Sequence, residues 1–319
     1  MVCFVFYPGA ASAQLSTRCP RHASEFVCLS SGGSKALRGR APPTLPRPHP
    51  SRHGAKVRIS AAKADAEVRP PGSVGRTVKD MKEAIQAALS SRLSRVDIQL
   101  PPGTSFGLEA NASGAALYAS ESLSSEERSS RECARLVLEM FAGTELNTAV
   151  IFNDASATTA ARAMWLEHGD ATLLDAKALA KRSKSPEKPL DVMICVAPRI
   201  RALMQIKSAS EEAGDRMAVI LINARLESIR WPNAPLAEFF LGGFENVLLY
   251  DVLEDDGSGK LSLYRKFPAK FTLCRKEGLG APKVVHSWDR RPEAAELQTV
   301  VRNLPAPAKG LFSGLPKLF

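Results

Sequence analysis

Three short apolar runs constrain the fold of this chain more than any other feature of its sequence. They are Thr148–Phe152, Asp191–Ala197 and Met217–Ile222. After its first residue, each run consists of apolar residues only and does not alternate with polar ones. Strands that are buried on both faces show this pattern, whereas a strand with one solvated face alternates. A segment with helical periodicity follows each of the first two runs, which is typical of βαβ units. The sequence therefore predicts a three-layer α/β fold with a mainly parallel sheet in its first half.

Further elements are predicted before and between these runs. Apolar residues recur at three- and four-residue spacing from Arg76 to Ser94, which predicts an amphipathic helix. The segment Arg95–Leu100 alternates between polar and apolar residues and predicts a strand. Ser124 and Glu127 fit a capping box, so we expect a helix to begin there.

The second half of the chain has a different pattern. After Leu236, strand-forming runs follow at short intervals: Val247–Tyr250, Leu261–Phe267, Lys270–Arg275 and Lys283–Trp288. This spacing predicts an antiparallel hairpin region appended to the parallel half. A last amphipathic helix is predicted over residues 292–303, with three residues facing inward: Leu297, Val300 and Val301. We therefore expect a single α/β domain over residues 76–303, followed by a loose apolar tail over residues 304–319.

The first 64 residues differ in composition from the rest. They hold ten Lys and Arg against one acid, Glu25, so they carry +9 of the net charge of +10. Ser, Ala and Pro are also abundant, which is typical of an organelle transit peptide. Proline residues at 42, 43, 46, 48 and 50 disfavour the helix of a mitochondrial presequence. We predict a disordered plastid transit peptide over residues 1–61, removed between Ser60 and Ala62; an ordinary basic tail is the alternative.

The motifs of several kinds of chemistry are missing from the sequence. The segment 257–260 resembles a phosphate loop only in part, because Glu254 and Leu261 stand where that motif needs Gly and Ser or Thr. We interpret it as a hairpin turn. His168 is interpreted as a helix cap and His286 as a half-buried strand residue. We name no catalytic residue, cofactor or metal site, and interpret the cysteines after residue 64 as buried thiols.

Polar residues at the ends of the apolar runs are the candidate site. In open α/β sheets, ligands bind outside the carboxyl ends of the parallel strands. Five residues are placed to meet there: Asn153, Asp154, Arg199, Asn223 and Arg225. Together they could bind a phosphate, a carboxylate or a protein partner. The alternative is structural: Asp154 caps a helix and pairs with Arg225, while Asn223 joins a buried hydrogen-bond set.

A series of short blocks resembles a known family. The blocks are Ile98–Pro102, Ile151–Asp154, Val196–Pro198, Ile222–Leu226, Leu263–Pro268 and Asp289–Pro292. In this order they are similar to an uncharacterised domain family of cyanobacteria and plastids. One plant branch is an assembly factor of the low-photosystem-II-accumulation type, and another carries the domain behind an adenylate kinase. Ala224 and Phe271 depart from the family's usual Pro and Trp. No kinase activity follows from the resemblance, because the phosphate loop is lacking.

Two functions are consistent with these observations. The resemblance implies a non-catalytic factor, stromal or peripheral on the thylakoid, that assists biogenesis of a photosynthetic complex such as photosystem II. It would bind plastid proteins through the apolar tail and the antiparallel edge strands near Lys270. The alternative is an enzyme or sensor that binds a phosphometabolite or nucleotide at the strand ends. Nucleic acid is not expected as a partner, because residues 65–319 carry a net charge of +1.

Overall fold

The computed structural model describes residues 68–104, 124–165, 171–182, 189–253, 260–278 and 280–305. The chain divides into two units, Met1–Ala61 and Ala62–Phe319, and all described residues belong to the second. The predictions for the transit peptide, for His168 and for the tail beyond Pro305 lie outside the described residues. So does the turn over residues 254–259.

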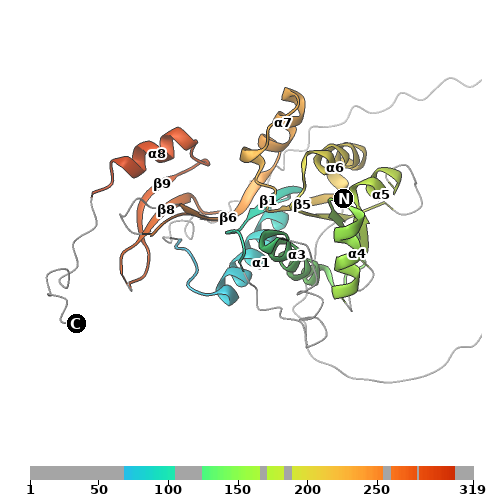
Figure 1. Cartoon of the computed structure of the whole chain (residues 1–319), viewed down its shortest axis with the longest axis horizontal. Helices are drawn as coiled ribbons and strands as arrows, with labels where there is room; N and C mark the ends of the chain where they lie inside the picture. Colours follow the sequence, from blue (N-terminus) through green and yellow to red (C-terminus); the bar gives the residue numbers. More distant parts are fainter. Residues whose placement is uncertain are drawn as a thin grey trace, which may run out of the picture. The chain divides into compact units, whose positions relative to one another are not determined.

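One nine-stranded sheet organises the described part of the chain (Figure 1). Its strands are β1 (Arg95–Gln99), β2 (Thr148–Phe152), β3 (Thr172–Asp175), β4 (Val192–Val196), β5 (Ala218–Ile222), β6 (Glu245–Leu253), β7 (Lys260–Lys266), β8 (Phe271–Lys276) and β9 (Lys283–Trp288). In space their order is β3-β2-β4-β5-β1-β6-β7-β8-β9. The pairs from β3 to β6 are parallel, and those from β6 to β9 are antiparallel. The predicted fold class is confirmed, and β6 is the strand at which the sheet changes direction.

Among the described residues, helices cover both faces of the parallel half, and one further helix follows β9. They are α1 (Val74–Ser90), α3 (Ser125–Leu138), α4 (Ala155–Met164), α5 (Ala176–Arg182), α6 (Ile200–Ala213), α7 (Ala234–Leu241) and α8 (Ala294–Arg302), with 3-10 turns η2 (Glu139–Phe141), η3 (Gly214–Arg216) and η4 (Leu226–Ser228). Helices α1, α3 and α4 pack on one face of the sheet, and α5, α6 and α7 pack on the other. The central strands β2, β4 and β5 are buried throughout, as their apolar runs predict.

The predicted boundaries differ from the observed ones where local backbone geometry ends an element. Helix α1 stops at Ser90, four residues before the predicted end, because Arg92 adopts a left-handed φ of 63°. The N–H groups of Ser91 and Leu93 then bond to carbonyls in the last turn, which closes the helix. The capping box at Ser124 and Glu127 is confirmed, and α3 begins at Ser125, directly after the capping residue Ser124.

Three elements were missed by the sequence analysis. Strand β3 has four residues and helix α5 seven, so neither gives a periodic pattern long enough to recognise. Helix α7 was also missed, and it spans Leu236, after which the sequence pattern predicted strands. Asn233 caps it by accepting a hydrogen bond from Leu236 N at 2.9 Å, and a proline lies in its first turn.

The antiparallel strands form a small region of their own. Leu249, Leu263 and Phe271 pack together with Trp288. Lys270 precedes β8, which lies between β7 and β9, so the outer strand is β9 and not the strand near Lys270.

His286 on β9 is exposed rather than half-buried, and the apolar residues of α8 are only partly buried. No helix among the described residues is long and apolar enough to span a membrane.

Candidate functional site

Three of the five predicted site residues, Arg199, Asn223 and Arg225, contact the first turns of α3, and the other two lie at the end of β2. Asn153 links two strand ends: its Nδ2 donates to Ala197 O at 2.9 Å, and its Oδ1 accepts from Arg199 N at 2.7 Å. The Arg199 side chain reaches Glu127 in α3, with an Nη2–Oε1 distance of 2.8 Å. Asp154 caps α4 by accepting from Ala157 N at 2.9 Å.

Asn223 and Arg225 complete this strand-end network. Asn223 is buried; its Oδ1 accepts from Leu100 N at 2.8 Å and its Nδ2 donates to Ser130 Oγ at 2.9 Å. Arg225 donates through Nε to Glu126 at 2.9 Å and through Nη2 to Leu100 O at 3.2 Å. The proposed ion pair with Asp154 is therefore wrong, because the acid that faces Arg225 comes from the first turn of α3.

The backbone is strained at these strand ends. Ala197, Asn223 and Arg225 have φ values of 41°, 51° and 46°, in the left-handed region that residues other than glycine seldom occupy. All five predicted residues make intramolecular hydrogen bonds, so a ligand at this edge would compete with bonds already formed. A binding role for these residues stays a prediction.

A second polar cluster lies in the centre of the sheet and was not predicted. Asp97 and Gln99 belong to β1 and are only 2% and 4% exposed. Their neighbours Val96 and Ile98 join the core beneath α1 and α3 on the opposite face. The alternation of this strand is therefore real, but its polar face is covered by other parts of the chain rather than by solvent.

A β-bulge brings Asn246 to Asp97. In the pairing of β1 with β6, Asp97 lies opposite Asn246 and Ile98 lies opposite Leu248, so Val247 is an extra residue. The extra residue lets Asn246 share a face with Asp97 while Leu248 and Val247 enter the other core. Asn246 Nδ2 then donates to Asp97 Oδ2 at 2.9 Å.

The Asp97 carboxylate is incompletely paired. Its Oδ2 also accepts from Gln99 Nε2 at 2.9 Å, but its Oδ1 is buried without a hydrogen-bond partner among the described residues. The same holds for Asn246 Oδ1. Burial raises the pKa of Asp97 from 3.8 to about 6, with the charge of Glu227 adding to the rise. The hydrogen bonds from Gln99 and Asn246, and the charge of Arg291, oppose it.

Arg265 of β7 supports this cluster from the antiparallel side. Its Nη1 donates to Asn246 O at 2.6 Å, its Nε donates to Ala269 O at 3.1 Å, and its Nη2 lies 2.6 Å from Glu245 Oε1. The guanidinium carbon also lies 4.4 Å from the centre of the Phe271 ring. Arg265 is therefore neutralised by Glu245, and it fixes the backbone beside Asp97.

The segment between β9 and α8 packs over the polar face of β1 that carries Asp97 and Gln99. Arg291 pairs with Glu227 of η4, and its Nη2 donates to Gln99 Oε1 at 3.3 Å. Glu227 in turn accepts from Gln99 Nε2 at 3.2 Å. Arg291 is half-buried and Pro292 is buried, whereas Arg290 is exposed.

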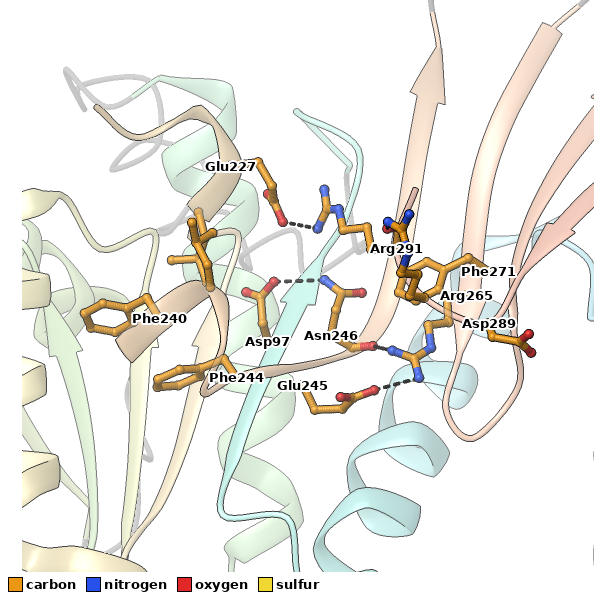
Figure 2. Close-up of a pocket in the computed structure, with 13 residues that line it drawn as sticks. Asp97, Glu227, Phe240, Phe244, Glu245, Asn246, Arg265, Phe271, Asp289 and Arg291 are labelled. Carbon is orange, nitrogen blue, oxygen red and sulfur yellow. Dashed lines mark hydrogen bonds and ion pairs between the residues drawn. The ribbon is translucent and has the colours of Figure 1, made fainter. Parts of the chain in front are cut away.

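A cavity of about 270 Å³ opens at Asp97. Figure 2 shows Asp97 between Phe240 and Phe244 on one side and Asn246 on the other, with Arg265 and Arg291 beyond Asn246. Gly243 is required just before β6, because a Cβ there would lie 2.4 Å from Phe239 O. The arrangement joins an apolar, aromatic wall to a buried carboxylate with one free acceptor, which are the features of a small-molecule site.

The sequence held weak signals of this site. Asp97 and Gln99 are polar residues in a strand beside apolar runs, and Asp289–Pro292 is one of the family blocks. Neither signal shows that a segment some 190 residues later would bury the polar face of β1. Among the residues described, no group of three or more His, Cys, Asp or Glu side chains is arranged to hold a metal ion.

The described residues thus form a mixed α/β domain with a cavity beside a buried carboxylate. Residues 71–299 match the family described as "Domain of unknown function (DUF1995)", and the chain belongs to this family. The resemblance of the sequence blocks to an uncharacterised domain family is confirmed at this level. No curated protein and no solved structure matches the chain.

Proposed function

We propose that this chain is a non-catalytic plastid factor that binds proteins and assists biogenesis of a photosynthetic complex such as photosystem II. It acts in the stroma or peripherally on the thylakoid. The series of blocks from Ile98 to Pro292 carries the proposal, since it resembles a family of which one plant branch is such an assembly factor, and it lies within the family region. The composition of residues 1–61 supports a plastid location.

Strand β9 supports protein binding. It is the last strand of the sheet and pairs with β8. Lys283, His286 and Ser287 on it are exposed. An outer strand offers unpaired N–H and C=O groups to which an extended segment of another protein can add. We therefore place the contact with a photosystem assembly intermediate at β9.

A proline variant in β9 tests this proposal. The pairing of β8 with β9 shifts between Leu273 and Cys274 and leaves Val285 as the extra residue, where proline is tolerated. Val285→Pro removes the backbone N–H of this residue in the outer strand, whereas the matched control Val285→Thr keeps it. In a strain that lacks the gene, we expect Val285→Thr but not Val285→Pro to restore the complex. Transcripts for the subunits of the complex should be at normal levels in all of these strains.

The competing function is an enzyme or sensor for a phosphometabolite or nucleotide at the strand ends. Saturable nucleotide binding that is lost in both Asp154→Ala and Arg225→Ala would favour it. A strain without the gene that assembles its photosynthetic complexes normally, but lacks a metabolite conversion, would overturn the assembly proposal.

A further inference from the structure

We propose that the cavity at Asp97 binds a small organic cation, whose ammonium or guanidinium group donates hydrogen bonds to the Asp97 carboxylate. This site is separate from the β9 edge and goes beyond the proposed assembly function.

The charge balance of the cavity lining points to a cation. Apart from Asp97, each charged group that lines the cavity has a partner of opposite sign. The pairs are Glu227–Arg291, Glu245–Arg265, Asp289–Lys270 and Arg290–Glu296. The hydrogen-bond partners of Asp97 are the neutral amides of Gln99 and Asn246. A buried carboxylate without a cationic partner is costly, and a cationic ligand would supply the missing charge.

The unpaired acceptors also require a donor. Asp97 Oδ1 and Asn246 Oδ1 are both buried acceptors without a hydrogen-bond partner among the described residues. Arg291 Nη1 is a buried donor in the same lining, but the carboxylate of Glu227 neutralises it in an ion pair. Phosphate and carboxylate groups are acceptors and would leave both atoms unpaired. Ammonium and guanidinium groups carry several N–H donors and no acceptor, so they complement this site.

The rest of the cavity suits the apolar part of such a ligand. Phe240, Phe244 and Leu241 line it on the α7 side, and Phe271 lines it on the β8 side. Aromatic rings attract cations and also cover alkyl chains. A volume of about 270 Å³ lies just below the range of drug-sized pockets, so the ligand is small, on the scale of a short alkyl amine.

Titration of the full chain with four matched probes tests the inference. The probes are n-butylammonium, n-butylguanidinium, 1-butanol and butyrate, followed by calorimetry and by amide NMR shifts. At least one cation should bind saturably, and 1-butanol should bind about ten-fold more weakly or not at all, because hydrogen bonds to a charged group are stronger than neutral ones. Failure of both cations to bind, or equal binding of butyrate, would overturn the proposal.

Two variants tie binding to the cavity. Asp97→Asn removes the charge with little change in shape and should abolish cation binding. Leu241→Trp should block the cavity while it leaves Asp97 intact, since Leu241 lines the cavity and is half-exposed. Asp215→Asn removes an exposed carboxylate on η3 and should bind as the wild type does. Cation binding that survives Asp97→Asn would exclude this site.

The pH dependence gives an independent readout. The charged groups that face Asp97 are Glu227 from η4, Arg291 from the segment before α8, and the pair Glu245 and Arg265 from β6 and β7. Because the pKa of Asp97 is about 6, cation binding should weaken as the pH falls from about 7.5 to about 5. Binding that is unchanged over this range would contradict a role for the ionised carboxylate.

The cation could be a free amine or a basic side chain of a bound protein. Short peptides with one internal lysine, unmodified or acetylated on that lysine, distinguish these sources. Tighter binding of the unmodified peptide than of butylammonium indicates a protein side chain, and binding of the free amine alone indicates a metabolite. Either result supports the cation site. The β9 variants should not alter binding of the free amine, so failure of one proposal can be distinguished from failure of the other.

Discussion

The strand-end network and the Asp97 cavity are both polar clusters in one sheet, but they differ in how completely their groups are paired. At the strand ends, the side chain of Asn223 makes two hydrogen bonds within the protein. In the cavity, one oxygen of Asp97 is buried without a partner among the described residues. Buried polar groups are almost always paired in folded proteins, so an exception needs an explanation. The fully paired cluster stabilises the fold, whereas the incompletely paired one is arranged to accept a partner from outside.

The largest change in the free energy of unfolding is expected from Asn223→Ala. This variant leaves Leu100 N without its acceptor, removes the bond to Ser130 Oγ, which keeps only its bond to Glu126 O, and places alanine at a left-handed φ. Together these should lower the free energy of unfolding by about 3–5 kcal/mol. Urea unfolding at neutral pH measures it, with Asn223→Gly as the control that removes the backbone strain and keeps the hydrogen-bond loss. A cost below about 1 kcal/mol would show that the network is not structural.

Asp97→Asn is expected to change the free energy of unfolding by an intermediate amount and, unlike Asn223→Ala, to raise it. Because the pKa of Asp97 is raised from 3.8 to about 6, the folded state binds a proton more tightly than the unfolded state does. This carboxylate therefore lowers stability as the pH rises through that interval, by up to about 3 kcal/mol above pH 6. Asp97→Asn should raise the free energy of unfolding by about 1–3 kcal/mol near pH 7.5 and by much less near pH 4.5.

Urea unfolding at both pH values checks this prediction, with Asp215→Asn as the exposed control. A clear loss of stability in Asp97→Asn at neutral pH would place Asp97 with the structural cluster and remove the contrast between the two regions.

The smallest effect is expected from Arg199→Gln. The Arg199 side chain is 70% exposed, and its ion pair with Glu127 is screened by solvent. The free energy of unfolding should fall by no more than about 0.5 kcal/mol. Glu127→Ala should cost more, about 1 kcal/mol, because Glu127 also closes the capping box with Ser124 and alanine has no side-chain acceptor. Equal costs for both variants in urea unfolding would mean that the ion pair, and not the cap, stabilises the start of α3.

Local pattern predicted the strand-end network far better than the cavity. Asn153 and Asn223 follow apolar runs directly, and parallel strands bring their carboxyl ends together, so sequence alone placed them at one edge. Asp97 was interpreted as part of an alternating strand, for which a solvated face is the usual explanation. Its surroundings include Arg291 from a segment far along the chain, and its pairing depends on a bulge in β6. Both are tertiary features that no local window contains.

The bulge at Val247 makes the cavity sensitive to chain length as well as to residue identity. Loss of one residue between Asn246 and Leu248 would restore regular pairing with β1, but either Asn246 would turn away from Asp97 or Leu248 would leave the core. Related chains could therefore keep both the aspartate and the asparagine and still lack the site. Counting residues between these two positions is accordingly a better guide to a shared site than matching the residues alone.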